Sequence, residues 1–253
     1  MKITIITVCY NSAATISDVL HSVDSQTWPN IEHWVIDGAS RDGTLDLLQA
    51  HATPWRHVLS ESDCGIYDAM NKGLALATGD VVGFLNSDDI FAHPEVVSTI
   101  AQTMHDRSID ACYGDLVYVA PNDMSKVVRY WKSQKYRHGL FDRGWVPAHP
   151  TFYARRELYE KYGGFDTEMR LAADFDILLR FFEAYKINTS YIPQVMVRMR
   201  LGGATNGSFK NVLRQNIEIS QAFKKYGLSA GPKPFIFKLM SRFSQFLRRP
   251  SAR

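Results

Sequence analysis

A short apolar run that ends in two acids constrains this chain more than any other stretch. Residues 81–85 are mostly apolar, which is typical of a strand buried on both faces, and Asp88 and Asp89 follow almost at once. Open α/β sheets bind ligands at the carboxyl ends of their strands. Adjacent carboxylates repel each other unless water, a cation or a hydrogen-bonding ligand compensates them, and Mg²⁺ carrying phosphates does so. The alternative is an acidic turn in which one of the two acids caps a helix near Pro94.

Strands alternate with helices through the N-terminal part of the chain. Apolar and β-branched runs predict strands at residues 2–10, 31–36, 56–60 and 81–85, and helical spacing predicts helices at 16–23, from 45, and at 66–77. This alternation implies βαβ crossovers, so we expect an α/β fold with a mostly parallel central sheet and helices on both faces. After residue 105 the pattern indicates a hairpin at 111–120 and 126–131, a loop at 132–147, a short strand at 151–153, and helices at 155–162, 175–184 and 211–226. A single domain over residues 1–227 with a C-terminal extension is the simplest interpretation.

The composition is that of an ordinary soluble globular protein, with 45% hydrophobic and 22% charged residues. No apolar run is long enough to cross a bilayer and no signal-peptide pattern opens the chain, so we expect a cytoplasmic protein. Cys9, Cys64 and Cys112 lie far apart, which argues against a zinc knuckle or a disulfide framework. The absence of a Walker A loop and of a G-x-G-x-x-G motif argues against an ATPase or a dehydrogenase.

The charges are distributed unevenly. Residues 228–253 contain six Lys or Arg and no Asp or Glu, which leaves 23 basic against 26 acidic residues elsewhere. Within 232–249, Phe235, Leu239 and Phe243 fall on one helical face, so we predict an amphipathic helix on an anionic membrane surface. A helix packed on the body or a disordered end is the alternative. A basic, aromatic stretch at 126–143 is a candidate wall of an acceptor groove, and the acidic body argues against nucleic acid as a partner.

Four short motifs occur in order along the chain: Thr7-Val8-Cys9-Tyr10-Asn11, Asp37-Gly38-Ala39-Ser40 with Asp42-Gly43-Thr44, Asn86-Ser87-Asp88-Asp89, and Ala173-Asp174. In these motifs the chain resembles the family 2 glycosyltransferases, nucleotide-sugar transferases with a single Rossmann-like GT-A domain. Two further motifs, Gly65-Ile66-Tyr67-Asp68-Ala69-Met70-Asn71-Lys72-Gly73 and Gly163-Gly164-Phe165-Asp166, resemble the branch that builds bacterial surface polysaccharides such as O-antigen and colanic acid. The resemblance extends over about residues 3–205.

The resemblance implies a nucleotide-sugar site at the strand ends. The backbone around Thr7, Cys9, Tyr10 and Asn11 and the carboxylate of Asp37 would hold the base and ribose, with a turn-forming role as the alternative for Asp37. Helical spacing places Asp68 and Asn71 on one face as further donor contacts, and Lys72 within reach of a phosphate. The apolar stripe of the same helix, Ile66, Met70 and Leu74, indicates that much of this segment serves packing.

Asn86, Ser87 and Asp88 occupy the position of the family's metal-binding D-x-D motif, with Asn86 in place of the first acid. The resemblance implies that Asp88 and Asp89 bind a divalent metal, Mn²⁺ or Mg²⁺, and that Asp88 also contacts the ribose. The exchange of an acid for Asn86 removes one negative charge, which weakens the case for a metal. A loss of metal binding is therefore the alternative interpretation of Asn86.

Asp174 matches the family's catalytic base at the start of a helix, and one base suffices for an inverting single displacement. An acid favoured by the helix macrodipole is the alternative, and the two roles are compatible. Asp176, two residues on, is expected to point elsewhere. His149, in Pro147-Ala148-His149-Pro150, matches a family position near the diphosphate or the acceptor, although a lone His is more often structural.

The resulting hypothesis is an inverting hexosyltransferase. It moves a sugar from a nucleoside diphosphate, with UDP favoured by family frequency, to a hydroxyl of a polyprenyl-diphosphate-linked glycan in O-antigen, lipopolysaccharide or related polysaccharide biosynthesis. Residues 1–105 would bind the nucleotide sugar and 106–227 the acceptor, which places the enzyme in the cytoplasm or peripherally on the inner membrane face. Residues 132–147 and 202–205 would select the sugars.

Two other functions stay open at this point. A sugar-1-phosphate nucleotidyltransferase would need a glycine-rich, basic phosphate loop after the first strand, and residues 10–14 offer none. A non-catalytic carbohydrate-binding protein is supported mainly by Asn86.

Overall fold

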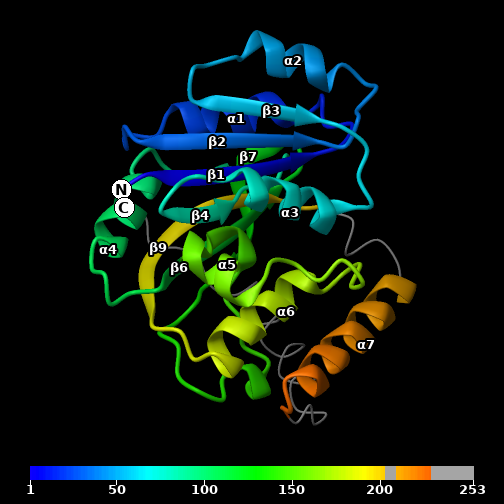
Figure 1. The fold of residues 1–253 in the computed structure, drawn as a ribbon. Helices are drawn as coiled ribbons and strands as arrows, with labels where there is room; N and C mark the ends of the chain where they lie inside the picture. The colour runs from blue at the N-terminus through cyan, green and yellow to red at the C-terminus, as the bar shows by residue number, and fades with distance from the viewer. Residues whose placement is uncertain (203–208, 229–253) are drawn as a thin grey trace.

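The computed structural model describes residues 1–202 and 209–228, which form one sheet of nine strands with helices on both faces (Figure 1). The strands are β1 (Ile3–Cys9), β2 (Ile31–Asp37), β3 (Arg56–Ser60), β4 (Val81–Phe84), β5 (Asp89–Phe91), β6 (Ala111–Ala120), β7 (Asp123–Trp131), β8 (Tyr153–Arg155) and β9 (Thr189–Arg200). The helices are α1 (Ile16–Asp24), α2 (Thr44–Ala50), α3 (Ile66–Leu76), α4 (Val96–Met104), α5 (Arg156–Tyr162), α6 (Ala173–Leu179) and α7 (Phe209–Lys225). Short helical turns lie at η1 (Phe141–Arg143), η2 (His149–Thr151) and η3 (Arg180–Ala184), the last a π-helical continuation of α6.

The first four strands form a parallel sheet in the order β3-β2-β1-β4. Strands β1 and β4 consist mainly of apolar or β-branched residues, whereas β2 also buries Glu32, His33 and Asp37; all four residues of β4 are buried. Cys9 at the end of β1 pairs with Asp37 at the end of β2, so the carboxyl ends of these strands meet at one edge of the sheet. This arrangement confirms the α/β prediction for the N-terminal half.

Beyond β4 the sheet becomes mixed. Strand β8 runs antiparallel to both β4 and β6, β9 runs parallel to β6, and β5 and β7 are antiparallel to β9 and β6. The second half therefore lacks the regular βαβ crossovers that keep strands parallel, because β6 and β7 form the predicted hairpin and the three-residue strands β5 and β8 insert as antiparallel neighbours. The α/β fold stands as predicted, with a sheet that is parallel in its first half and mixed in its second.

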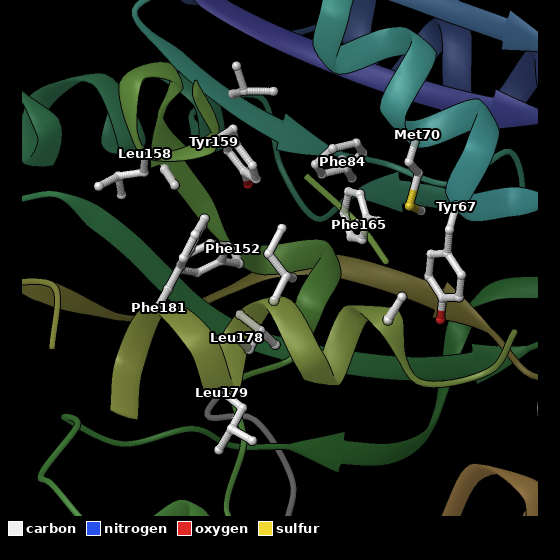
Figure 2. Close-up of a cluster of buried hydrophobic side chains, with 14 of the residues drawn as sticks. Tyr67, Met70, Phe84, Phe152, Leu158, Tyr159, Phe165, Leu178, Leu179 and Phe181 are labelled. Atoms are coloured by element: carbon white, nitrogen blue, oxygen red, sulfur yellow. The ribbon is translucent and has the colours of Figure 1, made fainter. Parts of the chain in front are cut away.

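Both faces of the sheet are buried under helices. Ile3 and Ile5 of β1 pack with residues of α1 and α4, whereas Ile6 and Val8 face α3 and share a cluster with residues of α5, α6 and α7. Figure 2 shows part of this second cluster, in which Phe165 lies between Phe84 and Tyr67, with ring centroids 5.1 and 5.7 Å away. The second cluster joins the parallel half of the sheet to the helices that follow β8.

Three elements differ from the predictions. The twelve-residue strand β9 was absent from the predicted elements, because Pro193 interrupts its pattern. The pairing with β6 jumps from Tyr113↔Tyr191 to Asp115↔Val195, so the irregularity in the ladder falls at this proline. Asp89 opens β5, and α4 begins at Val96 with Glu95 as its N-cap, so the predicted helix cap at Asp88 or Asp89 is wrong.

Candidate active site

The loops that follow β1, β2 and β4 are joined by hydrogen bonds at the carboxyl edge of the sheet. The backbone N–H of Asn11 donates to Oγ of Ser40 over 2.7 Å, and Oδ1 of Asn11 accepts from the backbone N–H of Arg41 over 2.9 Å. The hydroxyls of Ser12 and Ser87 share a hydrogen bond of 2.9 Å. Three motifs that are far apart in the sequence are therefore held together as one surface.

The side chains of Thr7 and Cys9 face the interior of the fold. Thr7 is fully buried, and its hydroxyl shares a hydrogen bond of 3.0 Å with Nε2 of His33. The thiol of Cys9 lies 3.6 Å from Oδ1 of Asp37, and burial followed by the charge of Asp37 raises the pKa of this thiol. The side chains of Thr7 and Cys9 are therefore unavailable to a ligand, and the contact that the resemblance implies for these two residues would have to come from their backbone.

The carboxylate of Asp37 accepts hydrogen bonds from groups of the protein, mainly in the turn that follows β2. It is fully buried, and Oδ2 accepts hydrogen bonds from the backbone N–H of Ser40 over 3.0 Å and from the hydroxyl of Ser60 over 2.7 Å. The hydroxyl of Ser40 donates to Oδ1. These contacts correspond to the turn-forming alternative, so the structure does not support a direct contact between the Asp37 carboxylate and a nucleotide.

Tyr10 and Asp63 lie at the open rim of the same surface. Tyr10 is 64% exposed, and a Cβ placed on Gly38 would lie 3.3 Å from its ring and 2.6 Å from Oδ2 of Asp63. Gly38 therefore lets both side chains approach the end of β2. Asp63 is absent from the predicted site, although its place in the loop after β3, the third parallel strand, is the signal that would have identified it.

The two acids after β4 lie in different environments. Asp88 is half-buried, and burial raises the pKa of its carboxyl group while the charge of Arg200 opposes the shift. Asp89 is fully buried; burial and the neighbouring Asp88 raise the pKa of its carboxyl group well above the ordinary value. The side-chain amide of Asn86 donates to Oδ2 of Asp89 over 3.3 Å, and within residues 1–202 and 209–228 Oδ1 of Asp89 has no hydrogen-bond partner. Asp88 is thus accessible to a ligand and Asp89 is not.

A cleft lies between the sheet and the helices α6 and α7, next to the end of β4. Its lining includes Tyr67, Asn86, Trp131, His149, Asp174 and Arg200. Asp174, in the first turn of α6, accepts hydrogen bonds at Oδ1 from the hydroxyl of Tyr67 over 3.2 Å and from the backbone N–H of Phe175 over 2.8 Å. Asp176 points away from the cleft and accepts a hydrogen bond of 3.0 Å from the hydroxyl of Tyr226 on the far side, as predicted.

His149 is brought close to Asp174. Its ring stacks on Phe84 with centroids 5.5 Å apart, and its Nε2 atom is buried without a hydrogen-bond partner in the part of the chain that the structure describes. Burial lowers the pKa of His149, and the charge of Asp174 opposes this shift only in part, so the imidazole is neutral near pH 7. A neutral ring with an unpaired ring nitrogen at the cleft wall can accept or donate one further hydrogen bond.

The residues of α3 that were predicted to contact the nucleotide-sugar donor form hydrogen bonds or ion pairs with other protein groups. The amide of Asn71 donates to the carbonyl of Phe165 over 2.9 Å and accepts from its backbone N–H over 2.8 Å. Asp68 accepts a hydrogen bond of 3.0 Å from the backbone N–H of Cys64, and Lys72 pairs with Glu61 over 2.8 Å. Asn71 therefore holds the 163–166 segment in place, and a donor contact by Asn71 is not supported.

Tyr67 and Arg200 line the cleft and were not among the predicted site residues. Tyr67 belongs to a motif whose helical spacing indicates packing, and its bond to Asp174 spans 107 positions that no local pattern connects. Arg200 ends β9, pairs with Asp18 of α1, and donates to the carbonyl of Pro121 over 2.8 Å. The sequence signal that could have identified Arg200 as a site residue is its position between a strand and the glycine pair at 202–203.

The aromatic residues of the stretch at 126–143 pack mainly in the core, whereas its basic residues Lys126, Lys132, Lys135, Arg137 and Arg143 are exposed. Tyr130 donates a hydrogen bond to the buried Asp115, and Tyr136 and Phe141 pack with Phe182. Trp131 and Arg129 line the cleft. The predicted acceptor wall is therefore confined to the end of β7.

Residues 4–172 match the sequence profile described as "Glycosyl transferase family 2". The chain belongs to glycosyltransferase family 2. Membership makes this protein a glycosyltransferase.

Curated relatives of this family 2 glycosyltransferase come from bacteria and archaea. The "PGL/p-HBAD biosynthesis glycosyltransferase" of Mycobacterium tuberculosis is 31% identical over 202 residues, which cover 78% of this chain and 76% of the relative. The "Glycosyltransferase AglE" of Haloferax volcanii is 24% identical over 179 residues, covering 68% of this chain and 58% of the relative. These names leave the predicted surface-polysaccharide branch untested.

Solved structures show the same fold. The mannosyltransferase PcManGT from Pyrobaculum calidifontis, in complex with GDP-Man and Mn²⁺, gives a TM-score of 0.66 at 23% identity over 95% of this chain and 68% of that chain. TarS residues 1–349 of S. aureus, in complex with UDP-GlcNAc, gives a TM-score of 0.68 at 18% identity over 96% of this chain and 73% of that chain. The GT-A prediction is confirmed by this likeness.

The residues after β4 fit a divalent metal only in part. Asp88 offers a half-buried carboxylate that accepts no hydrogen bond from another side chain within residues 1–202 and 209–228. The prediction that Asp89 is a second ligand is not supported, because that side chain is fully buried and its ionisation is disfavoured. No group of three or more His, Cys, Asp or Glu in the described ranges is placed to hold a metal alone. A metal here would need substrate phosphate for most of its ligands, which is the usual mode of Mg²⁺.

No helix within the described ranges is both long and apolar enough to cross a bilayer. The predicted amphipathic helix at 232–249, and most of the predicted sugar-selecting segment 202–205, lie outside the described residues.

Proposed function

We propose that this protein is an inverting glycosyltransferase that moves a sugar from a nucleoside-diphosphate sugar, with UDP as the first candidate, to a hydroxyl of a lipid-linked glycan. The observation that carries the proposal is the position of Asp174 in the cleft beside the Asn86-Ser87-Asp88 loop, with Tyr67 holding one carboxylate oxygen. This arrangement provides a base next to the strand end where a diphosphate would bind.

The donor would bind over the joined loops at the ends of β1, β2 and β4. Tyr10 offers an exposed ring on which a base can stack, and Asp63 offers a carboxylate at the same rim. The backbone of residues 7–11 and Ser87 completes this surface. That PcManGT binds GDP-Man and TarS binds UDP-GlcNAc supports a nucleotide-sugar donor for the shared fold.

Asp88 is the residue that would hold a divalent metal, Mn²⁺ or Mg²⁺, together with the diphosphate. Such an ion, when bound, neutralises the charge that develops on the departing diphosphate. Arg200 contributes a second positive charge, since its field reaches both Asp88 and Asp89. Asn86 keeps Asp89 in place by its hydrogen bond and adds no charge to the loop.

Asp174 would take the proton of the acceptor hydroxyl as that hydroxyl attacks the anomeric carbon. Because Oδ1 is occupied by Tyr67 and by the backbone of Phe175, Oδ2 is the oxygen left for the acceptor. Burial and the charge of Asp174 raise the pKa of Tyr67 well above its ordinary value, so its hydroxyl stays protonated and donates to the base. His149, neutral and with Nε2 unpaired, would orient the sugar or the acceptor by one hydrogen bond.

The acceptor would enter the cleft along α6 and α7. The M. tuberculosis relative is named for the biosynthesis of PGL and p-HBAD. For this chain, a lipid-linked precursor of O-antigen, colanic acid or another bacterial surface polysaccharide is the acceptor that the motifs predict. In this proposal residues 1–105 hold the donor and residues 106–227 the acceptor.

Binding and turnover test the proposal separately. Calorimetric titration with UDP should show binding in Mn²⁺ or Mg²⁺ that weakens with chelator and is lost in Asp88→Asn. Asp89→Asn is the matched control and should bind as the wild type does, because its side chain does not reach the ligand. Asp174→Asn should bind UDP normally but release no UDP from UDP-sugars when acceptor is present, with a loss of about 10²–10⁴ in kcat.

Two outcomes would contradict parts of this assignment. Full turnover in Asp174→Asn would show that another residue is the base. Absence of UDP binding with and without metal would shift the donor to GDP or dTDP, whose titrations come next.

A further inference from the structure

Helix α7 forms one wall of the cleft with its inner side. Ile219, Ala222 and Phe223 are buried, and the ring of Phe223 lies 5.7 Å from that of Phe175 on α6. Gln215 and Ile219 line the cleft. Helices α6 and α7 therefore lie side by side, with α7 outermost in the C-terminal part of the fold (Figure 1).

The outer side of α7 exposes large apolar side chains. Leu213 is 55% exposed and Ile217 is 51% exposed; Val212, 39% exposed, lies about 100° from Leu213 around the helix and is not part of this side. These are three of the seven large apolar side chains that are exposed among the described residues, and they fall within six consecutive positions. Isolated apolar residues on a surface are ordinary, whereas a cluster on one helix marks an interaction site.

The same side of α7 is basic. At 100° per residue, Lys210, Leu213, Ile217 and Lys224 fall within about 60° of one another. Glu218 is the sole acidic residue of the helix, and it is buried on the inner side, where it accepts hydrogen bonds from Leu171 and Arg214. The exposed side therefore combines apolar and positively charged groups without a negative one.

This combination suits an anionic lipid surface. Apolar side chains of an interfacial helix enter the boundary between headgroups and acyl chains, and each basic residue near an anionic surface contributes about 1 kcal/mol. The sequence that follows α7 adds six basic and no acidic residues over positions 228–253, so the charge complementarity continues along the chain.

We propose that the outer side of α7, formed by Leu213 and Ile217 with Lys210 and Lys224, binds the surface of a membrane that contains anionic lipids. The helix would then lie between the bilayer and the cleft, and the cleft would open beside the membrane. The inference does not depend on the transfer reaction, because it rests on the exposure and charge of α7 alone.

Co-sedimentation of the full chain with vesicles tests the proposal. The wild type should bind vesicles of phosphatidylcholine and phosphatidylglycerol in equal parts, and bind phosphatidylcholine alone much more weakly. The double variant Leu213→Ser/Ile217→Ser should lose at least about tenfold in vesicle affinity, since it removes both apolar side chains that would enter the lipid boundary. Val58→Ser, an exposed apolar residue of β3 that is 43% exposed, is the matched control and should bind as the wild type does.

A second double variant tests the contribution of the basic residues, and a hydrodynamic measurement tests whether the outer side of α7 instead joins two copies of this chain. Lys210→Gln/Lys224→Gln should weaken binding to the mixed vesicles only and leave the weak binding to phosphatidylcholine unchanged. Vesicle binding by Leu213→Ser/Ile217→Ser equal to that of the wild type would overturn the proposal and assign any binding to residues outside α7. Conversion of a wild-type dimer to a monomer by the same variant, without vesicles present, would overturn it in favour of an interface between copies of this chain.

Discussion

The hydroxyl of Tyr67 donates a hydrogen bond to Oδ1 of Asp174 over 3.2 Å, and so joins α3 to the first turn of α6 across 107 positions of sequence. Tyr67 is nine-tenths buried and stacks on Phe165, which holds its ring in place (Figure 2). In the proposed mechanism Tyr67 is a positioning residue, because it orients the base and leaves one carboxylate oxygen for the acceptor.

Tyr67→Phe should therefore lower kcat by about ten- to a hundredfold, since a hydrogen bond to a charged group is worth about 1.5–3 kcal/mol. The KM for the donor should stay unchanged, because Tyr67 orients the base and does not hold the nucleotide. Steady-state kinetics measures both constants. Tyr159→Phe is the matched control, because Tyr159 is a buried tyrosine of the same cluster whose hydroxyl has no hydrogen-bond partner among the described residues. A fall in kcat in Tyr159→Phe equal to that in Tyr67→Phe would show that Tyr67 does no more than fill space.

Asn71 is predicted to stabilise the fold and not to bind the donor. Its amide makes both hydrogen bonds to the backbone of Phe165, at 2.9 and 2.8 Å. Asn71→Ala should lower the free energy of unfolding by about 1–3 kcal/mol, because buried backbone groups lose their partners. Urea unfolding measures this loss, and Gln49→Ala on the exposed side of α2 is the control with no expected change. A several-fold rise in the KM of Asn71→Ala for the donor sugar nucleotide, at unchanged stability, would instead support the original prediction that Asn71 contacts the donor.

Asn86→Asp restores the acid that the family's metal motif has, and it is expected to destabilise this chain. Position 86 faces Oδ2 of the buried Asp89 at 3.3 Å, so a carboxylate there adds a negative charge beside a carboxyl group that already resists ionisation. We expect a loss of about 1–3 kcal/mol at about pH 8 that shrinks towards about pH 5, where one carboxyl group takes up a proton.

Thermal unfolding at both pH values measures this dependence, and Asn86→Ala separates the loss of the hydrogen bond from the added charge. A variant Asn86→Asp that is as stable as the wild type and binds Mn²⁺ more tightly would instead identify Asn86 as a lost metal ligand. The result thus decides whether Asn86 serves to stabilise the buried Asp89 or stands where a metal ligand was lost.

The parallel half of the fold could be predicted because its signals are local. Residues 81–84 are apolar and buried on both faces, and the turns after β1 and β2 contain the polar residues that such turns require. The position of Asp174 in the first turn of a helix also followed from a short motif. His149 was predicted near the diphosphate or the acceptor by resemblance alone, and its place in the same cleft as Asp174 is a tertiary effect.

The remaining features depend on contacts between distant segments. Strand β9 contains Pro193 and is stable because β6 and β5 pair with it on both sides, which no local pattern shows. The pairing of β5 with β9 is also what buries Asp89, so its exclusion from a metal site is a tertiary effect. Asn71 faces a different partner from the one predicted because the 163–166 segment, 94 residues away, fits against α3.

Glu32 lies at the edge of the sheet opposite the site, and we predict that it controls how the free energy of unfolding falls at acid pH. Its carboxylate accepts hydrogen bonds from Nζ of Lys2 over 2.8 Å, from the hydroxyl of Thr4 over 2.6 Å, and from the backbone N–H of Thr78 over 2.8 Å. Burial alone would raise the pKa of Glu32, but these donors outweigh it and lower the pKa from 4.5 to about 2. A carboxyl group whose pKa is lowered by folding stabilises the folded state above its ordinary pKa, and this contribution is lost as the pH falls from 4.5 towards about 2.

Glu32→Gln should therefore lower the free energy of unfolding by up to about 3 kcal/mol near pH 7, and the difference from the wild type should close as the pH falls through that window. Urea unfolding at a series of pH values measures the difference. Glu61→Gln is the control, because the Glu61 side chain is 51% exposed in its ion pair with Lys72, and an exposed pair contributes little. A Glu32→Gln variant whose stability runs parallel to the wild type across the whole window would show that the carboxylate is no better stabilised in the folded chain than in the unfolded one.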